Sequence, residues 1–231
     1  MTLTLVPVEG IPEVRPGDDL VGLIAERAEL AAGDVVVVTQ KVVSKAEGRL
    51  VEVDPEDRDA RAELVGSEAV RILRRRGDLI MTETRHGFVC ANAGVDLSNV
   101  EPGWAALLPV DPDRSARRIR DGLRARLGVS VGVVVSDTFG RAWRRGVTDV
   151  AIGVAGVAGV VDLRGRADAL GRELAVTEVC VADEIASAAE LAMGKASAVP
   201  VVVVRGVDPS WLREASVAGE VVRPHREDLF R

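Results

Sequence analysis

Cysteine is scarce in this sequence of 231 residues. Its two cysteines, Cys90 and Cys180, lie in unrelated segments, and neither belongs to a Cys-x-x-Cys or Cys/His pair. A structural zinc site needs several such ligands at short spacing, and a disulfide framework belongs to an oxidising compartment. We therefore expect neither feature, and we expect two reduced thiols in a cytosolic protein.

Long hydrophobic runs and an excess of basic residues are also absent. No apolar stretch approaches the roughly 18 residues that span a bilayer, and the first residues lack the pattern of a signal peptide. The 30 basic and 36 acidic residues give a formal charge of −6, so composition forces no basic face for a polyanion. These absences predict a soluble, cytoplasmic protein that binds neither membrane nor nucleic acid.

What the sequence does contain is a globular pattern of alternating helices and strands, with 47% hydrophobic residues. Apolar spacing predicts helices over 17–33, beginning at Asp18 and ending at Gly33, and over 55–76, 116–127 and 181–192. Apolar runs predict buried strands at 35–38, 131–135 and 199–204. Residues 150–161 suit either closely packed core or a subunit interface. The interleaved order predicts an α+β fold with mixed sheets.

Two acidic residues each follow an apolar stretch. Asp137 and Thr138 follow the valine run at 131–135, so we expect them at the carboxyl end of a strand, where open sheets place ligands. Asp96 lies in the segment Gly94-Val95-Asp96-Leu97-Ser98-Asn99. Carboxylate and hydroxyl oxygens are the ligands that hard cations prefer, which makes a shared metal and phosphate site a hypothesis for these three residues.

Each acidic residue also has an ordinary structural interpretation. Asp96 alone is typical of an Asx turn, and Asp137 with Thr138 could cap a helix. For Asp137 both interpretations stay open, because Arg141, Arg144 and Arg145 follow closely and could bind an anion. Trp143, in the same segment, could stack on a base or sugar, or pack as core or interface.

The segment 38–45 places Lys41 and Lys45 four residues apart, directly after a strand. At that spacing both could meet phosphate from one side of a helix. The segment is not a Walker A loop, and Gly153-x-x-Gly156-x-x-Gly159 does not have the spacing of a dinucleotide fingerprint. We interpret those glycines as packing positions, and the two histidines as structural rather than catalytic.

Read together, several segments resemble the coenzyme F420-0:L-glutamate ligase family, whose members add γ-linked glutamate to the deazaflavin cofactor F420. The match runs nearly from end to end. The segments that carry it are Gly10-Ile11-Pro12-Glu13, Pro16 to Leu20, Gly33 to Lys45, Gly48-Arg49, Ala93 to Val100, Leu108-Pro109, Ser136 to Arg144, Gly171 to Leu174, Ala182 to Ala186 and Arg205-Gly206.

The resemblance implies a GTP-dependent ligase with a two-lobed fold that acts as a homodimer. It implies two divalent ions, Mn²⁺ or Mg²⁺, on Asp96, Asp137 and Thr138, with K⁺ as a further ion. It places GTP contacts on these positions: Ile11, Pro12, Glu13, Val14, Gln40, Lys45 and Asn99. The 231 residues are expected to form one ligase domain of the stand-alone type, whether as one body or as two intertwined subdomains.

In the mechanism that follows from this resemblance, Asp96 and Asp137 hold the metal and Lys45 neutralises charge on the transferred γ-phosphoryl group. The carboxylate of F420-0 forms an acyl phosphate, which the amine of L-glutamate then attacks. Two other functions are compatible with the same residues: a metal-dependent phosphohydrolase, and a protein that binds GTP without consuming it.

Overall fold

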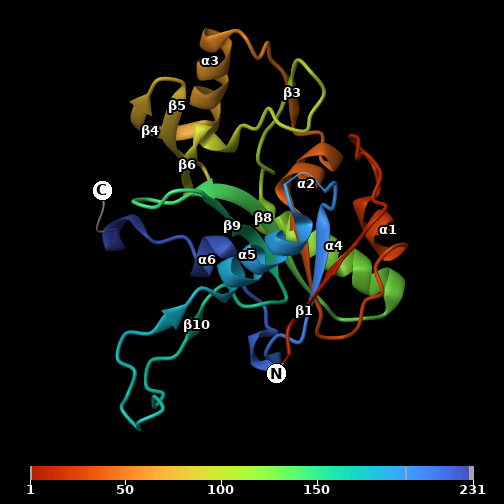
Figure 1. Cartoon of the computed structure of the whole chain (residues 1–231), viewed down its shortest axis with the longest axis vertical. Helices are drawn as coiled ribbons and strands as arrows, with labels where there is room; N and C mark the ends of the chain where they lie inside the picture. Colours follow the sequence, from red (N-terminus) through yellow and green to blue (C-terminus); the bar gives the residue numbers. More distant parts are fainter. Residues whose placement is uncertain (1, 196, 229–231) are drawn as a thin grey trace.

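The computed structural model describes residues 2–195 and 197–228, and a five-stranded sheet forms its centre (Figure 1). The strands lie in the order β1-β12-β2-β8-β9. They are β1 (Thr4–Pro7), β2 (Val35–Thr39), β8 (Gly132–Gly140), β9 (Val147–Ala155) and β12 (Val201–Arg205). Only β2 and β8 run parallel among neighbours in this sheet, and the other pairs are antiparallel. The predicted mixed α and β architecture is confirmed.

The central strands of this sheet consist mostly of buried valines. All four valines of β2 are fully buried, and so are the three that begin β8. A strand covered on both faces must be apolar at consecutive positions, which explains why the sequence shows unbroken runs rather than alternation. The strands predicted at 35–38, 131–135 and 199–204 are all present.

Helices cover the sheet. They are α1 (Leu20–Ala25), α2 (Gln40–Ala46), α4 (Pro112–Leu127), α5 (Val181–Met193) and α6 (Val217–Glu220). Helix α4 packs on β8 and β9, and α5 packs across β9, β12 and β1. The Asp111 side chain caps the start of α4, and Gly128 ends it in the left-handed conformation that glycine favours. The helices predicted at 116–127 and 181–192 are confirmed, and none among the described residues has the length and apolarity needed to cross a membrane.

The first predicted helix is mostly wrong. It spans Leu20–Ala25 rather than 17–33, with Asp19 and not Asp18 accepting the capping bond from the Gly22 N–H. The chain then turns toward β2, and the Gly33 N–H donates to the Ser130 carbonyl at 3.0 Å. This tertiary hydrogen bond takes the place of a helical hydrogen bond, which the apolar spacing alone would favour.

The segment 53–103, which we call the insertion, leaves and re-enters the body through a two-stranded neck. The neck pairs β3 (Leu50–Glu52) with β7 (Trp104–Ala106). The insertion contains α3 (Arg58–Glu68), β4 (Ala69–Arg76), β5 (Leu79–Thr84), β6 (Val89–Ala91) and the 3-10 turn η1 (Asn92–Gly94). It lies above the main sheet in Figure 1 and has a small apolar cluster of its own, centred on Val65, Ile80 and Ala93.

The helix predicted over 55–76 is therefore only half right. Helix α3 ends at Glu68, and residues 69–76 form a strand that pairs with β5. Ile72 fits the helical spacing that Val65 and Ala69 begin, yet it lies in the strand and is exposed. Pairing between neighbouring strands outweighed the local pattern.

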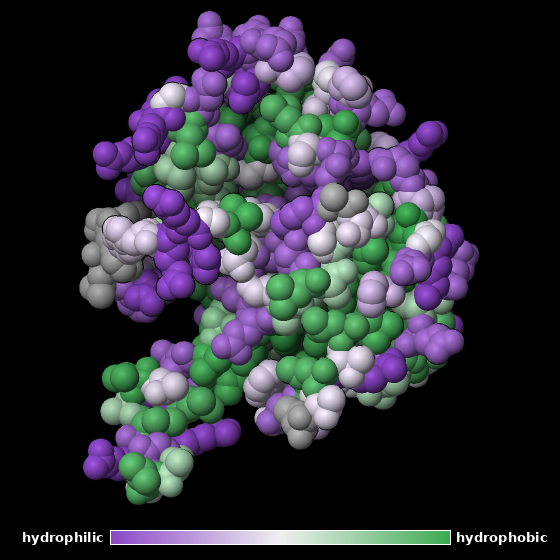
Figure 2. Space-filling model, viewed as in Figure 1, coloured by the Kyte–Doolittle hydropathy of each residue, from purple (hydrophilic) through white to green (hydrophobic). Residues whose placement is uncertain are grey.

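A second projection is the arm formed by residues 160–180. It contains the short strands β10 (Val161–Asp162) and β11 (Glu178–Val179) and extends away from the body (Figures 1 and 2). Leu170 is 80% exposed and Val176 is 86% exposed. The remaining short elements are the 3-10 turns η2 (Pro209–Trp211) and η3 (His225–Glu227).

Residues 150–161 begin in β9, and the part up to Ala158 is core rather than a free surface. Ile152, Val154 and Val157 are each at most 1% exposed. Gly153 lies where the first turn of α4 crosses β9, and a Cβ there would be 2.3 Å from the Pro112 carbonyl oxygen. The packing interpretation of this glycine is confirmed.

We predict that Gly153→Ala destabilises the fold, because the backbone of α4 cannot move aside without disturbing β9. Overpacking of this kind costs about 1–3 kcal/mol of unfolding free energy. Gly66→Ala is a matched control, since Gly66 lies in helix α3 with nothing within 4 Å of the added Cβ. That control should be neutral or up to about 1 kcal/mol more stable. Urea unfolding of both variants checks the prediction, and equal stability would contradict it.

Candidate functional site

The two parallel strands end unevenly, and this creates an open edge. Strand β2 ends at Thr39, which pairs with Ser136, while β8 continues to Gly140. Beyond Ser136, β8 has a partner only in β9, and the Asp137 carboxylate itself accepts the Thr138 N–H at 2.8 Å. Asp137 and Thr138 therefore lie inside β8 rather than after it, and the helix-cap interpretation is wrong. Their position beyond the carboxyl end of β2 agrees with the expected place for a ligand.

Asp96 approaches this edge from the insertion. Its Oδ1 accepts the Ser98 N–H at 2.7 Å, which confirms the Asx turn. Its Oδ2 lies 2.6 Å from the ammonium of Lys41, in the first turn of α2. Lys41 also donates to the carbonyl and hydroxyl oxygens of Ser98, so one lysine ties the insertion to the end of β2.

The two carboxylates lie in different electrostatic environments. Burial, helped by the negative charges of Asp96 and Asp149, raises the pKa of Asp137 to about 7, although the Thr138 N–H and the charge of Lys41 act to lower it. Burial also acts to raise the pKa of Asp96, but hydrogen bonds from Lys41 and Ser98 outweigh it and hold that pKa below its ordinary value. The charge of Asp96 thus disfavours the ionised form of Asp137, and an added cation would neutralise this repulsion.

The residues at this edge fit a divalent ion that is shared with a phosphate. The described part of the chain has no group of three or more His, Cys, Asp or Glu side chains placed to hold a metal alone. Asp96 and Asp137 provide two hard oxygen donors, and Mg²⁺ in nucleotide sites is commonly held by one or two carboxylates plus phosphate oxygens and water. The donor set therefore suits an ion that arrives with its nucleotide.

Thr138 faces the opposite side of the strand from Asp137. Its hydroxyl donates to Asp149 Oδ1 at 2.6 Å and accepts from the Lys195 ammonium at 2.6 Å. Asp149 is 3% exposed, lies directly across from Thr138 on β9, and also accepts from Ser136. Successive strand residues alternate between faces, so the three predicted metal ligands do not converge from one side.

The predicted GTP contacts lie around α2. Lys45 is buried and pairs with Glu13, and its ammonium also donates to the Asn99 carbonyl at 2.7 Å. Three of the seven predicted positions therefore meet at one point. Pro12 and Glu13 are exposed, Ile11 is half-buried and Val14 is buried.

Gln40 is also buried, and its amide donates to Ser44 and to the Leu107 carbonyl. In this arrangement it joins α2 to the strand neck, with its amide hydrogens directed away from solvent.

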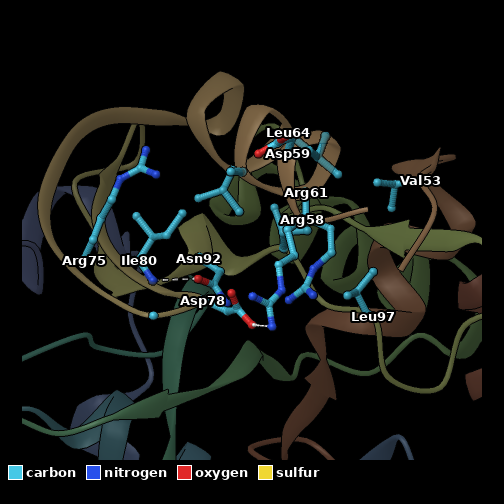
Figure 3. A pocket seen from close by; sticks show the side chains of 14 residues that line it. Val53, Arg58, Asp59, Arg61, Leu64, Arg75, Asp78, Ile80, Asn92 and Leu97 are labelled. Atoms are coloured by element: carbon cyan, nitrogen blue, oxygen red, sulfur yellow. Dashed lines mark hydrogen bonds and ion pairs between the residues drawn. The ribbon is translucent and has the colours of Figure 1, made fainter. Parts of the chain in front are cut away.

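The insertion has a cavity of about 210 Å³ between α3 and the β4–β5 hairpin. Val95 and Leu97 are among its lining residues, and Leu97 is labelled in Figure 3, whereas Asp96 between them pairs with Lys41. The opening of the cavity is lined by Arg58, Arg61 and Asp78 (Figure 3). The Arg58 guanidinium lies 3.6 Å from the Asp78 carboxylate. Neither carboxylate of the acidic pair is among the residues that line this cavity.

Two residues of the site were missed by sequence reasoning. Asp149 interrupts an otherwise mostly apolar strand, Val147–Ala155, and that interruption was the available signal. Lys195 follows helix α5 and is far from Thr138 in the sequence, so only the fold brings them together.

We predict that Lys195→Met lowers the free energy of unfolding, because it leaves the buried Asp149 carboxylate without its cation. Hydrogen bonds to charged groups suggest a cost of about 2 kcal/mol. Glu190→Gln is the matched control: Glu190 contacts Lys195 at 2.8 Å but leaves the Asp149 contact intact. It should cost about 0.5 kcal/mol. Urea unfolding measures both, and equal losses would show that the Asp149 pairing contributes nothing.

Comparison with known proteins shows extended similarity. A family model described as F420-0:gamma-glutamyl ligase matches residues 10–206. The coenzyme F420:L-glutamate ligase of Methanopyrus kandleri is 47% identical over 100% of this chain and 98% of its own length. The proteins of the same name from Methanothermobacter thermautotrophicus and Archaeoglobus fulgidus are each 41% identical over 100% of this chain, and over 100% and 97% of their own lengths. The chain therefore belongs to the F420-0:gamma-glutamyl ligase family, as its sequence motifs predict.

Proposed function

We propose that this F420-0:L-glutamate ligase uses GTP to activate the F420-0 carboxylate as an acyl phosphate, and that the reaction occurs at the open edge of β8. The observation that carries the proposal is the meeting of Asp137, Asp96 and Lys41 beyond the end of β2. A site with paired carboxylates and lysines suits phosphoryl transfer between substrates.

In this proposal Asp96 and Asp137 hold one or two Mg²⁺ or Mn²⁺ ions, with Thr138 at the adjacent position on β8. Bound there, the ions supply positive charge to the phosphate oxygens. Lys45 binds the phosphates beside Asn99 and the segment 11–14, where its ammonium is already held by Glu13. A phosphate group would compete with Glu13 for this ammonium, since Glu13 is exposed and able to move away.

The chemistry takes place between the substrates. An oxygen of the F420-0 carboxylate attacks the γ-phosphorus of GTP, and GDP leaves. The amine of L-glutamate then attacks the acyl carbon, phosphate leaves, and the amine loses a proton as the amide forms. The chain's own residues orient the three substrates and neutralise the developing charge, which is the main source of rate enhancement in such reactions. A second cycle on the new γ-carboxylate would add γ-linked glutamate.

One assay separates this function from its two alternatives. The purified protein is incubated with F420-0, GTP, Mn²⁺ and labelled L-glutamate, and the deazaflavin is examined by mass spectrometry. We expect its mass to increase by glutamyl units in step with GDP formation. Phosphate release without a mass change would indicate a phosphohydrolase, and GTP binding without consumption would indicate a non-catalytic protein.

We predict that Asp137→Asn abolishes most turnover and leaves the fold intact. The change removes one charge from the metal site and nearly preserves side-chain volume, so the rate should fall about 100-fold or more. The free energy of unfolding should change by less than about 1 kcal/mol, since burial already disfavours the charged form.

The matched control for this variant is Asp162→Asn, an exposed carboxylate on the arm. It should retain full activity. Full turnover in Asp137→Asn would refute the assignment of Asp137, whereas lost activity in both variants would indicate a cause unrelated to the metal site.

A further inference from the structure

The tip of the β8–β9 hairpin combines an exposed aromatic side chain with an unusual backbone conformation. Trp143 is 83% exposed and has a φ of 57°, in the left-handed region that bulky side chains rarely adopt. A large aromatic side chain that is both strained and solvated contributes little to folding. Residues held in this way are commonly found at ligand sites.

Three arginines lie within two residues of this tryptophan in the sequence. Arg141, Arg144 and Arg145 are all exposed, and none of them forms an ion pair with a carboxylate in the part of the chain that the structure describes. Within this group the Arg141 guanidinium donates to the Arg145 carbonyl at 3.4 Å, and the Arg144 N–H donates to the Arg141 carbonyl at 3.3 Å. The tip is thus a concentrated positive charge beside an exposed aromatic ring.

The hairpin is also firmly attached to the reaction site. Its strand β8 carries Asp137, and Phe139, two residues further, packs edge-on against Phe88 of the insertion with ring centroids 6.1 Å apart. From Asp137 to Gly140 the extended strand covers about 10 Å, and the tip lies beyond. The hairpin therefore holds the aromatic and cationic tip at a fixed distance from the acidic pair.

We infer that this tip, formed by Arg141, Trp143, Arg144 and Arg145, binds the deazaflavin end of F420-0. The inference rests on the proposed function and names the part of the site that recognises the acceptor. The substrate has a planar aromatic ring at one end and the reacting carboxylate at the end of a flexible anionic side chain. Trp143 stacks on the ring, the arginines pair with the side chain, and the carboxylate reaches the open edge at Asp137.

The position of the other substrate favours the deazaflavin over guanine as the stacked ring. The residues proposed to hold GTP surround α2, and the hairpin projects from the acidic pair in the direction away from α2 (Figure 1). The two substrates would thus approach Asp96 and Asp137 from opposite sides. Such an arrangement lets the carboxylate of one meet the γ-phosphate of the other.

Binding is tested directly by titrating F420-0 with protein in the absence of GTP and following deazaflavin fluorescence. Aromatic stacking predicts that Trp143→Ala weakens binding by about 10-fold or more. Trp143→Phe should retain most of the affinity, and Arg144→Ala combined with Arg145→Ala should weaken binding in a salt-dependent manner. Leu170→Ala, which shortens another highly exposed side chain on the arm, should bind as the wild type does.

Steady-state kinetics provide the second readout. In Trp143→Ala we expect a raised KM for F420-0, an unchanged KM for GTP and a kcat within about twofold of the wild type. Unchanged F420-0 affinity and KM would overturn the inference, and so would a raised KM for GTP alone, which would assign the stack to guanine. If the wild type adds no glutamate, the proposed function fails instead, and the fluorescence titration still decides whether the tip binds the ring.

Discussion

The site depends on one topological mismatch, the early end of β2 beside a longer β8. Between two paired strands the backbone groups bond to one another, so they are not free to bind a ligand. Because β2 turns into α2 at Gln40 while β8 continues to Gly140, one edge of β8 becomes free beside the start of a helix. Asp137 is the first residue on that free edge. Lys41, in the first turn of the helix, forms an ion pair with Asp96, the other carboxylate of the site.

Lysine and carboxylate pairs surround this edge on several sides. Lys41 bonds Asp96, Lys45 bonds Glu13, and Lys195 bonds Asp149. Each ammonium is positioned before a substrate arrives, which lowers the cost of ordering it on binding. The pairs differ in exposure: Glu13 is mostly solvated and can be displaced by phosphate, whereas Asp149 is buried and fixes Lys195 in place. A lysine–carboxylate pair is therefore a contact that phosphate can replace at Lys45, and a permanent contact at Lys195.

The parts of this arrangement that could be predicted from the sequence are those determined by burial. The valine strands need apolar residues on both faces, so β2, β8 and β12 were visible as runs, and Gly153 was visible as a packing position. The failures involve pairing between strands. Nothing local distinguishes β4 from a continuation of α3, because its apolar residues fit both periods and only the hairpin with β5 decides.

Asp149 was missed for a related reason. It faces Thr138 only because the β8–β9 register shifts between Val135 and Ser136, and a one-residue change in register would turn its side chain to the other face. Successive side chains of β8 point to opposite faces of the sheet, so neighbouring residues have different partners. Asp137 faces Asp96 and the insertion, and Thr138 faces Asp149 and Lys195. A substrate that lies along the free edge could contact both faces of β8. Asp137 and Thr138 would then act on it from different faces and would not occupy the same space. Strand β8 thus contributes valines to the core and Asp137 to the site. The hairpin that continues from β8 adds a third role, because it extends the contact surface beyond the sheet and leaves the valine core unchanged.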